Sequence, residues 1–147
     1  MAHPSPTIER LHAVRLIGPI FPPGDHERAE VARHGWSYTT VDGTTPEEIV
    51  PHLAEADIVS VVGTKMPATV IDALEANGRC RAIARLGAGT DRIDVERATM
   101  CGIVVMNTPY FCVEEQADHA MAMILSLARK LPLSQRLIEA EIGRAHV

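Results

Sequence analysis

The chain has 147 residues, of which 46% are apolar and 22% charged, and its formal net charge is −5. These values are typical of one globular domain with a core, and they exclude a disordered polyelectrolyte. A nucleic-acid surface needs clustered Lys and Arg, which the sequence lacks, so we expect no direct binding of nucleic acid. The longest apolar stretch, residues 120–127, is far shorter than the roughly 20 residues of a membrane span.

The N-terminal residues and the cysteines indicate a cellular location. The first six residues have no apolar core, so we predict no signal peptide. The cysteines, Cys80, Cys101 and Cys112, are odd in number and form no CxxC pair. We interpret them as small buried or half-buried side chains, not as disulfide or zinc ligands. A reducing, cytoplasmic location is therefore expected.

Short apolar runs alternate with helical patterns along the chain. Strands are predicted at residues 13–18, 36–41, 58–62, 81–86 and 103–106. Helices are predicted at 26–33 with Asp25 as the cap, from Thr45 onward, at 67–77, after an Asp94 cap, and at 113–131. The helix after Thr45 should be short or bent, because Pro51 falls within its first two turns. The alternation predicts an α/β fold: a parallel sheet of about five strands with helices on both faces, followed by a long helix.

Ligands of such sheets bind off the carboxyl ends of the strands, which directs attention to loops 63–66, 87–92 and 107–112. Residues 85–91 read Arg-Leu-Gly-Ala-Gly-Thr-Asp and contain G-x-G, but Arg92 stands where a dinucleotide fingerprint has its third glycine. Two interpretations of this loop are possible. In the first, successive backbone amides form a concave site for a carboxylate, assisted by Arg85. In the second, the glycines serve only a tight turn.

Three further features allow both a functional and a structural reading. Asn107, just past the fifth strand, either bridges loops or donates to a ligand. Glu115, Asp118 and His119 lie at a helix start, where a metal site or an acid–base pair is imaginable. No second His or Cys joins them, however, and acids in a first helical turn ordinarily pair with the helix dipole. Lys65 is either an anion contact or a solvated side chain.

Four motifs in order resemble the D-isomer-specific 2-hydroxyacid dehydrogenases, from about residue 56 to 140 and more loosely from residue 13. They are the string at 85–94, close to the family's R-x-G-x-G-x-D-N-I-D, then a short helix closed by Gly102, then Asn107-Thr108-Pro109, and the helix start at 113–118. The last motif is close to the subgroup that includes C-terminal-binding-protein-like and phosphoglycerate dehydrogenase-like members. Two positions depart from the pattern, since Gly63 replaces the usual Arg or His and Arg92 replaces the usual Asn.

The resemblance implies a flavodoxin-like substrate domain whose last long helix crosses into a nicotinamide-binding domain. It implies that the amides of Ala88 and Gly89 hold the substrate carboxylate, with Arg85 nearby, and we expect Thr64 to contact the substrate too. Gln116 is expected to approach the pyrophosphate of NAD or NADP at the helix start, and Asn107 is also assigned to the cofactor. The expected partners are a small 2-hydroxy or 2-oxo acid and, in the parent protein, a second copy in a homodimer.

The family's G-x-G-x-x-G and its catalytic Arg, Glu and His are expected downstream of this chain, so no catalytic residue is assigned and His119 is not the catalytic histidine. We therefore expect residues 1–112 to form the substrate-binding domain and 113–140 the interdomain helix and the start of the missing Rossmann domain. Residues 141–147 read Glu-Ile-Gly-Arg-Ala-His-Val, which one reading frame of a common sequencing-library adapter encodes, so this tail is expected to be non-native.

Two functions follow from these expectations. The first is an N-terminal fragment of an NAD(P)-dependent D-2-hydroxyacid dehydrogenase, inactive alone. The alternative is a standalone module that binds a small carboxylate or, like a corepressor, another protein. Exposure of Met121, Met123, Ile124 and Leu127 on the last long helix would favour a partner there.

Overall fold

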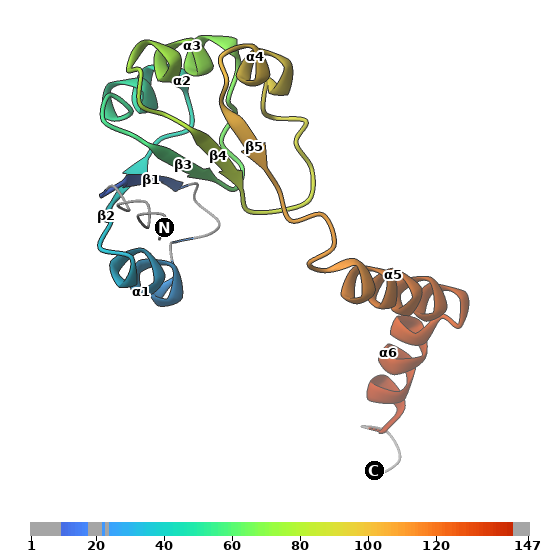
Figure 1. Ribbon diagram of the computed structural model, residues 1–147. Coiled ribbons are helices and arrows are strands. Elements are labelled where there is room, and N and C mark those ends of the chain that lie inside the picture. The colour runs from blue at the N-terminus through green and yellow to red at the C-terminus, as the bar shows by residue number, and fades with distance from the viewer. Residues whose placement is uncertain (1–9, 18–21, 23, 143–147) are drawn as a thin grey trace, which may run out of the picture. The chain divides into compact units, whose positions relative to one another are not determined.

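The computed structural model describes residues 10–17, 22 and 24–142 (Figure 1). The predictions made for the first residues, for the end of the first strand at residue 18 and for residues 143–147 lie outside the described part. Two compact units make up the chain, Met1–Pro109 and Tyr110–Val147. In the described ranges, no helix combines the length and the apolar character that crossing a membrane requires.

The first unit is built on one parallel sheet, as predicted. Its strands are β1 (His12–Ile17), β2 (Ser37–Asp42), β3 (Ile58–Val61), β4 (Ala82–Arg85) and β5 (Val104–Met106). Their order is β2-β1-β3-β4-β5, and all four pairings are parallel. Val14 on β1 is level with Val59 on β3, which in turn is level with Ile83 on β4. The sheet therefore places the loops after β3, β4 and β5 along one edge.

Among the residues that the structure describes, the helices between the strands are α1 (Asp25–Arg33), α2 (Pro46–Ile49), the 3-10 helix η1 (Val50–His52), α3 (Ala68–Ala76) and α4 (Val95–Met100). The predicted short or bent helix after Thr45 is confirmed, because α2 passes directly into the 3-10 turn that contains Pro51. The Asp94 cap is also confirmed, since its side chain accepts from the amide of Arg97.

The predicted cap at Asp25 is wrong. Helix α1 already includes Asp25, its cap is Gly24, and no side chain caps it. An acid in the first turn is stabilised by the helix dipole without acting as a cap, and the sequence pattern did not separate these two roles.

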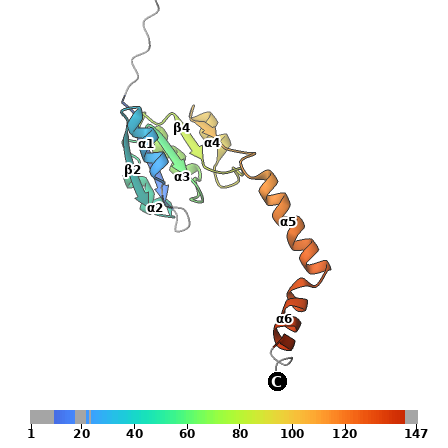
Figure 2. The same cartoon turned by 90° about the horizontal axis from the view of Figure 1, so that it is seen from below.

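The two faces of the sheet are covered differently, with α1 on one side and α3 and α4 on the other (Figures 1 and 2). The α3 side holds the apolar core, in which Val70, Ile71 and Leu74 of α3 are fully buried. Helix α1 buries no residue. Polar contacts attach it instead: the Glu27 carboxylate lies 3.5 Å from Nε of the buried Arg15.

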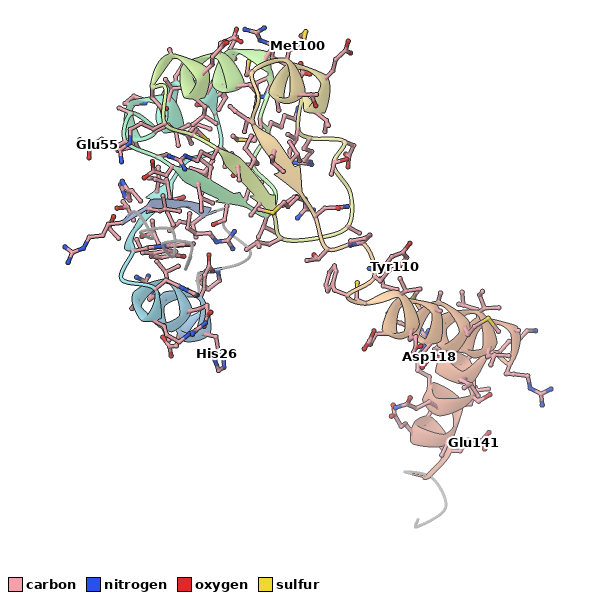
Figure 3. All side chains as sticks on the ribbon, in the orientation of Figure 1. His26, Glu55, Met100, Tyr110, Asp118 and Glu141 are labelled. Carbon is pink, nitrogen blue, oxygen red and sulfur yellow. The ribbon has the colours of Figure 1, made fainter. Side chains whose placement is uncertain are left out.

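The second unit contains α5 (Val113–Ala128) and α6 (Leu131–Ile142). Figure 3 labels Asp118 on the first of these helices and Glu141 on the second. The prediction of one helix over 113–131 is wrong at its end, because the backbone of Lys130 adopts φ 55° and a new helix begins at the next residue. Pro132 explains why α5 does not continue, because it has no N–H to donate to the carbonyl of Ala128 and its ring would collide with that carbonyl in a continuous helix.

Candidate functional site

Residues 85–94 form the central loop at the carboxyl edge of the sheet. Arg85 ends β4, and its guanidinium turns back over the loop that follows. Nη1 donates to the carbonyl of Leu86 at 2.7 Å, and Nε donates to the carbonyl of Gly89 at 3.0 Å. Arg85 therefore fixes the path of this loop from both ends.

Gly87 is required by this arrangement. Its φ is +154°, a conformation that side chains disfavour, and a Cβ there would lie 2.5 Å from Nη1 of Arg85. Gly87 thus gives the guanidinium the space to lie across the loop backbone.

Asn107 follows β5 and bridges two loops, which is one of the two roles that the sequence left open. Its Nδ2 donates to the carbonyl of Ala88 at 2.7 Å. Beside it, the amide of Thr108 donates to the carbonyl of Gly87 at 3.1 Å. The loop after β5 therefore holds the loop after β4 in place.

The resulting loop has an unequal distribution of donors and acceptors. Each carbonyl from Leu86 to Thr90 accepts a hydrogen bond from within the protein. In contrast, the backbone amides of residues 88–91 donate to none of the residues that the structure describes. Ala88 and Gly89 are both exposed. With its acceptors occupied and its donors available, the loop has the polarity that suits an anion.

The loop after β3 packs against this one. Met66 pairs with Ile93 in a parallel bridge, and the amide of Met66 donates to the carbonyl of Arg92 at 2.8 Å. Arg92 in turn donates from Nη1 to the carbonyl of Gly63 at 2.8 Å. The two positions that depart from the family pattern, 63 and 92, are therefore in direct contact, which no local sequence pattern indicated.

Thr64 lies in the same β3 loop, but it is only 4% exposed. Its buried hydroxyl has no hydrogen-bond partner in the described part of the chain. The expected contact of Thr64 with a substrate stays a prediction.

The described residues do not by themselves form a dinucleotide site. Arg92 stands at the position of the third glycine, and the helix that follows, α4, has six residues. Asn107 uses its amide group on Ala88. At the start of α5 the amide of Gln116 donates to the carbonyl of Cys112 at 3.0 Å, and two glutamates occupy the first turn. The cofactor roles of Asn107 and Gln116 therefore stay predictions.

One group of potential metal ligands occurs within the described ranges, and it is not the one suggested by the sequence. Asp72, Glu75 and Cys101 place one ligand atom each within 4.8 Å of one another. Both carboxylates are bound by the Arg97 guanidinium, at 2.5 and 3.0 Å. The cluster is thus a surface ion-pair network that holds α3 to α4.

Fold and site together define a class: a parallel α/β domain that presents, at the carboxyl edge of its sheet, backbone amides with no acceptor among the described residues. Comparison with known proteins narrows the class. Residues 15–140 match the family model described as D-isomer specific 2-hydroxyacid dehydrogenase, catalytic domain, and the chain belongs to this family. The resemblance inferred from the four sequence motifs is thereby confirmed.

Several relatives are phosphoglycerate dehydrogenases. The D-3-phosphoglycerate dehydrogenase of Mycobacterium tuberculosis (strain ATCC 25618 / H37Rv) is 35% identical over 94 residues, and that of Methanocaldococcus jannaschii is 38% identical over 91 residues. These matches cover 63% and 61% of this chain, and the chain spans 17% of the length of each relative.

Solved structures agree with the fold. The NAD+-bound 3-phosphoglycerate dehydrogenase of Entamoeba histolytica superposes with a TM-score of 0.57 at 28% identity, covering 65% of this chain and 32% of that one. The apo form of D-lactate dehydrogenase from Escherichia coli superposes with a TM-score of 0.62 at 18% identity, covering 86% and 40%. The second likeness concerns the fold alone.

Proposed function

We propose that this chain supplies the carboxylate-binding part of the active site of an NAD(P)-dependent D-2-hydroxyacid dehydrogenase. The observation that carries the proposal is the polarity of the loop after β4. Its carbonyls are occupied from Leu86 to Thr90, while the amides of residues 88–91 have no acceptor among the described residues. A substrate carboxylate is the acceptor that a 2-hydroxy or 2-oxo acid would bring to them.

In this proposal the residues of the loop have separate tasks. The amides of Ala88 and Gly89 bind the carboxylate and so orient the neighbouring C2 atom. Arg85 acts as a positioning residue, because its guanidinium donates to the carbonyls of Leu86 and Gly89. Asn107 has the same kind of task, through its bond to the carbonyl of Ala88. Holding one end of the substrate rigidly lowers the entropic part of the barrier to hydride transfer.

The nicotinamide of NAD or NADP, when bound in the parent enzyme, exchanges hydride with the C2 atom of the substrate. We propose that the chain 1–147 alone does not catalyse this exchange, because the acid–base residues implied by the family resemblance are not among its assigned residues. Purified chain mixed with a 2-oxo acid and NADH or NADPH should show no loss of absorbance at the nicotinamide band. Enzyme-dependent oxidation above the background would contradict this part of the proposal.

Carboxylate binding itself is tested by titrating the ¹⁵N-labelled chain with pyruvate and D-lactate and recording amide shifts. Saturable shifts of residues 88–91 are expected, and lactamide, the neutral analogue, should produce none. Ala88→Pro removes one donor and should abolish the shifts at 89–91, whereas Ala88→Gly retains the amide and should preserve them. Equal shifts with lactamide, or shifts that persist unchanged in Ala88→Pro, would refute binding through these amides.

A protein-interaction function is the second candidate, and an exposed apolar surface on α5 favours it. Met121, Met123, Ile124 and Leu127 are between 51% and 74% exposed. Apolar patches of this kind mark interaction sites. For the enzyme, we propose instead that the parent protein is a cytoplasmic homodimer and that a second copy covers this apolar surface. Sedimentation of the chain separates the candidates, because a corepressor-type module should be monomeric until its partner is added.

A further inference from the structure

Arg92 directly follows the four residues whose amides form the proposed carboxylate-binding loop. The amide of Ile93 donates to the carbonyl of Thr90 at 2.9 Å, so residues 90–93 form a tight turn. This turn keeps Arg92 beside the loop. Even along a fully extended chain, three residues span at most about 11 Å, so the backbone of Arg92 lies within that distance of Gly89.

The side chain of Arg92 is anchored on the loop after β3. Its Nη1 donates to the carbonyl of Gly63 at 2.8 Å. The backbone of Arg92 is fixed to the same loop, because its carbonyl accepts from the amide of Met66 at 2.8 Å. A ligand that binds this guanidinium therefore pays little for ordering a free arginine side chain.

Most of the donors on this guanidinium are available to a ligand. A guanidinium carries five N–H donors and stays protonated in proteins, and Arg92 is exposed. Within the described ranges, the bond to Gly63 is its one side-chain hydrogen bond, and no carboxylate forms an ion pair with it. The neighbouring acid, Asp91, has its Oδ1 against Gly89, 2.8 Å from the point where a Cβ of that residue would be.

Gly63 leaves open space next to the carbonyl that Arg92 binds. The residue is exposed, and a Cβ built on it would meet nothing within 4 Å. A larger residue at this position would place its side chain in that space. With glycine there, the space beside the anchored guanidinium can hold a group of a ligand.

We propose that Arg92 is a specificity-determining residue, which binds a second anionic group of the substrate while the amides of Ala88 and Gly89 bind its C1 carboxylate. The substrate class is then a 2-hydroxy or 2-oxo acid with a further carboxylate or phosphate at its other end. A guanidinium binds either oxyanion through paired hydrogen bonds. This inference rests on the proposed function, because it concerns the same substrate at the same edge of the sheet.

Two acids that differ by one charge test the proposal. D-malate carries a second carboxylate at C4, and its 4-amide replaces that group with a neutral one of nearly the same shape. Both keep the C1 carboxylate and the C2 hydroxyl. Each is titrated into the ¹⁵N-labelled chain, and the amide shifts of residues 88–91 give the dissociation constants. D-3-phosphoglycerate is the phosphate-bearing probe.

D-malate should bind about tenfold more tightly than its 4-amide to the unmodified chain. In Arg92→Gln this preference should vanish, while the affinity for the 4-amide should stay within about twofold, because the amides that bind the C1 carboxylate are retained. Arg92→Lys keeps the charge and should keep part of the preference. Lys65→Gln is the matched control, since it removes another exposed cation from the loop after β3, and it should leave the preference unchanged.

Tighter binding of D-3-phosphoglycerate than of D-malate identifies phosphate as the second group, and the reverse order identifies carboxylate. Equal affinities for D-malate and its 4-amide, with saturable shifts of residues 88–91, would overturn this inference and leave the proposed carboxylate-binding loop intact. Equal losses of preference in Arg92→Gln and Lys65→Gln would also overturn it, as would an Arg92→Gln loss of the same size for both acids. No shift of residues 88–91 with any of the acids would refute the proposed function as well.

Discussion

Gly87→Ala should weaken both the fold and the proposed carboxylate site, because the added methyl group collides with Arg85. The new Cβ would lie 2.5 Å from Nη1 and 2.8 Å from Cζ of that guanidinium. Arg85 must then leave at least one of its two carbonyl partners, Leu86 and Gly89. Each such bond contributes about 1 kcal/mol once partial exposure is taken into account.

Backbone strain adds to this loss, since a residue with a side chain held near φ +154° costs roughly 1–3 kcal/mol. The free energy of unfolding should therefore fall by about 2–4 kcal/mol. Urea denaturation followed by circular dichroism measures the change. Gly63→Ala is the matched control, because a Cβ there meets nothing within 4 Å, and its effect should be below about 0.5 kcal/mol.

A double-mutant cycle with Arg85→Ala separates collision from strain. In the Arg85→Ala background the guanidinium is gone, so Gly87→Ala should retain only the strain cost and become less destabilising by about 1 kcal/mol or more. An unchanged cost in that background would show that Arg85 does not fill the space beside Gly87. A cost equal to that of Gly63→Ala would refute the requirement for glycine altogether.

Three further measurements check contacts elsewhere in the first unit. Asn77→Ala should lower the free energy of unfolding by about 2–3 kcal/mol in urea denaturation, because the amides of Arg79 and Cys80 and the carbonyls of Leu53 and Ala56 each lose a bond to its side chain. No measurable change would contradict this. Burial tends to raise the pKa of Asp57, but the Arg79 guanidinium and the His12 amide outweigh it and lower the pKa in the fold. The carboxylate should therefore stabilise the protein at neutral pH and lose that contribution as the pH falls through its folded pKa. Asp57→Asn should remove this acid-dependent part of the free energy of unfolding. Identical plots of that free energy from pH 7 to 3 for the two proteins would argue against it. Burial raises the pKa of the Cys80 thiol to about 11. Alkylation of Cys80 at pH 8, followed by mass spectrometry, should therefore be roughly 100-fold slower in the folded chain than in urea. Equal alkylation rates in the two conditions would exclude the burial.

Local patterns were sufficient to predict the order of the elements. The β-branched run at 58–62 and the turn glycines locate strands and helix ends, and Asp94 signals its helix directly. The end of α5 was missed because the apolar pattern continues across Lys130, whereas Pro132 cannot continue the backbone hydrogen bonds of α5.

The candidate site was predictable as a loop but not as a set of contacts. The sequence pointed to residues 85–91 and to Asn107, and two alternatives were open for each. Which one holds depends on bonds between residues far apart in sequence, such as Asn107 with Ala88 and Arg92 with Gly63, 29 positions away. Periodicity carries no information on such pairs, because it reports only which face of an element is buried.

The bond between Arg92 and the carbonyl of Gly63 has a consequence for engineering. It uses the backbone of residue 63, not a side chain, and open space surrounds the position where a Cβ would be. Residue 63 can therefore be replaced by a charged, aromatic or hydroxyl-bearing residue without the loss of an existing contact. Under the proposed function, a library meant to change which acid binds would randomise this codon first and keep Arg92, which bonds to the backbone of residue 63 and not to its side chain.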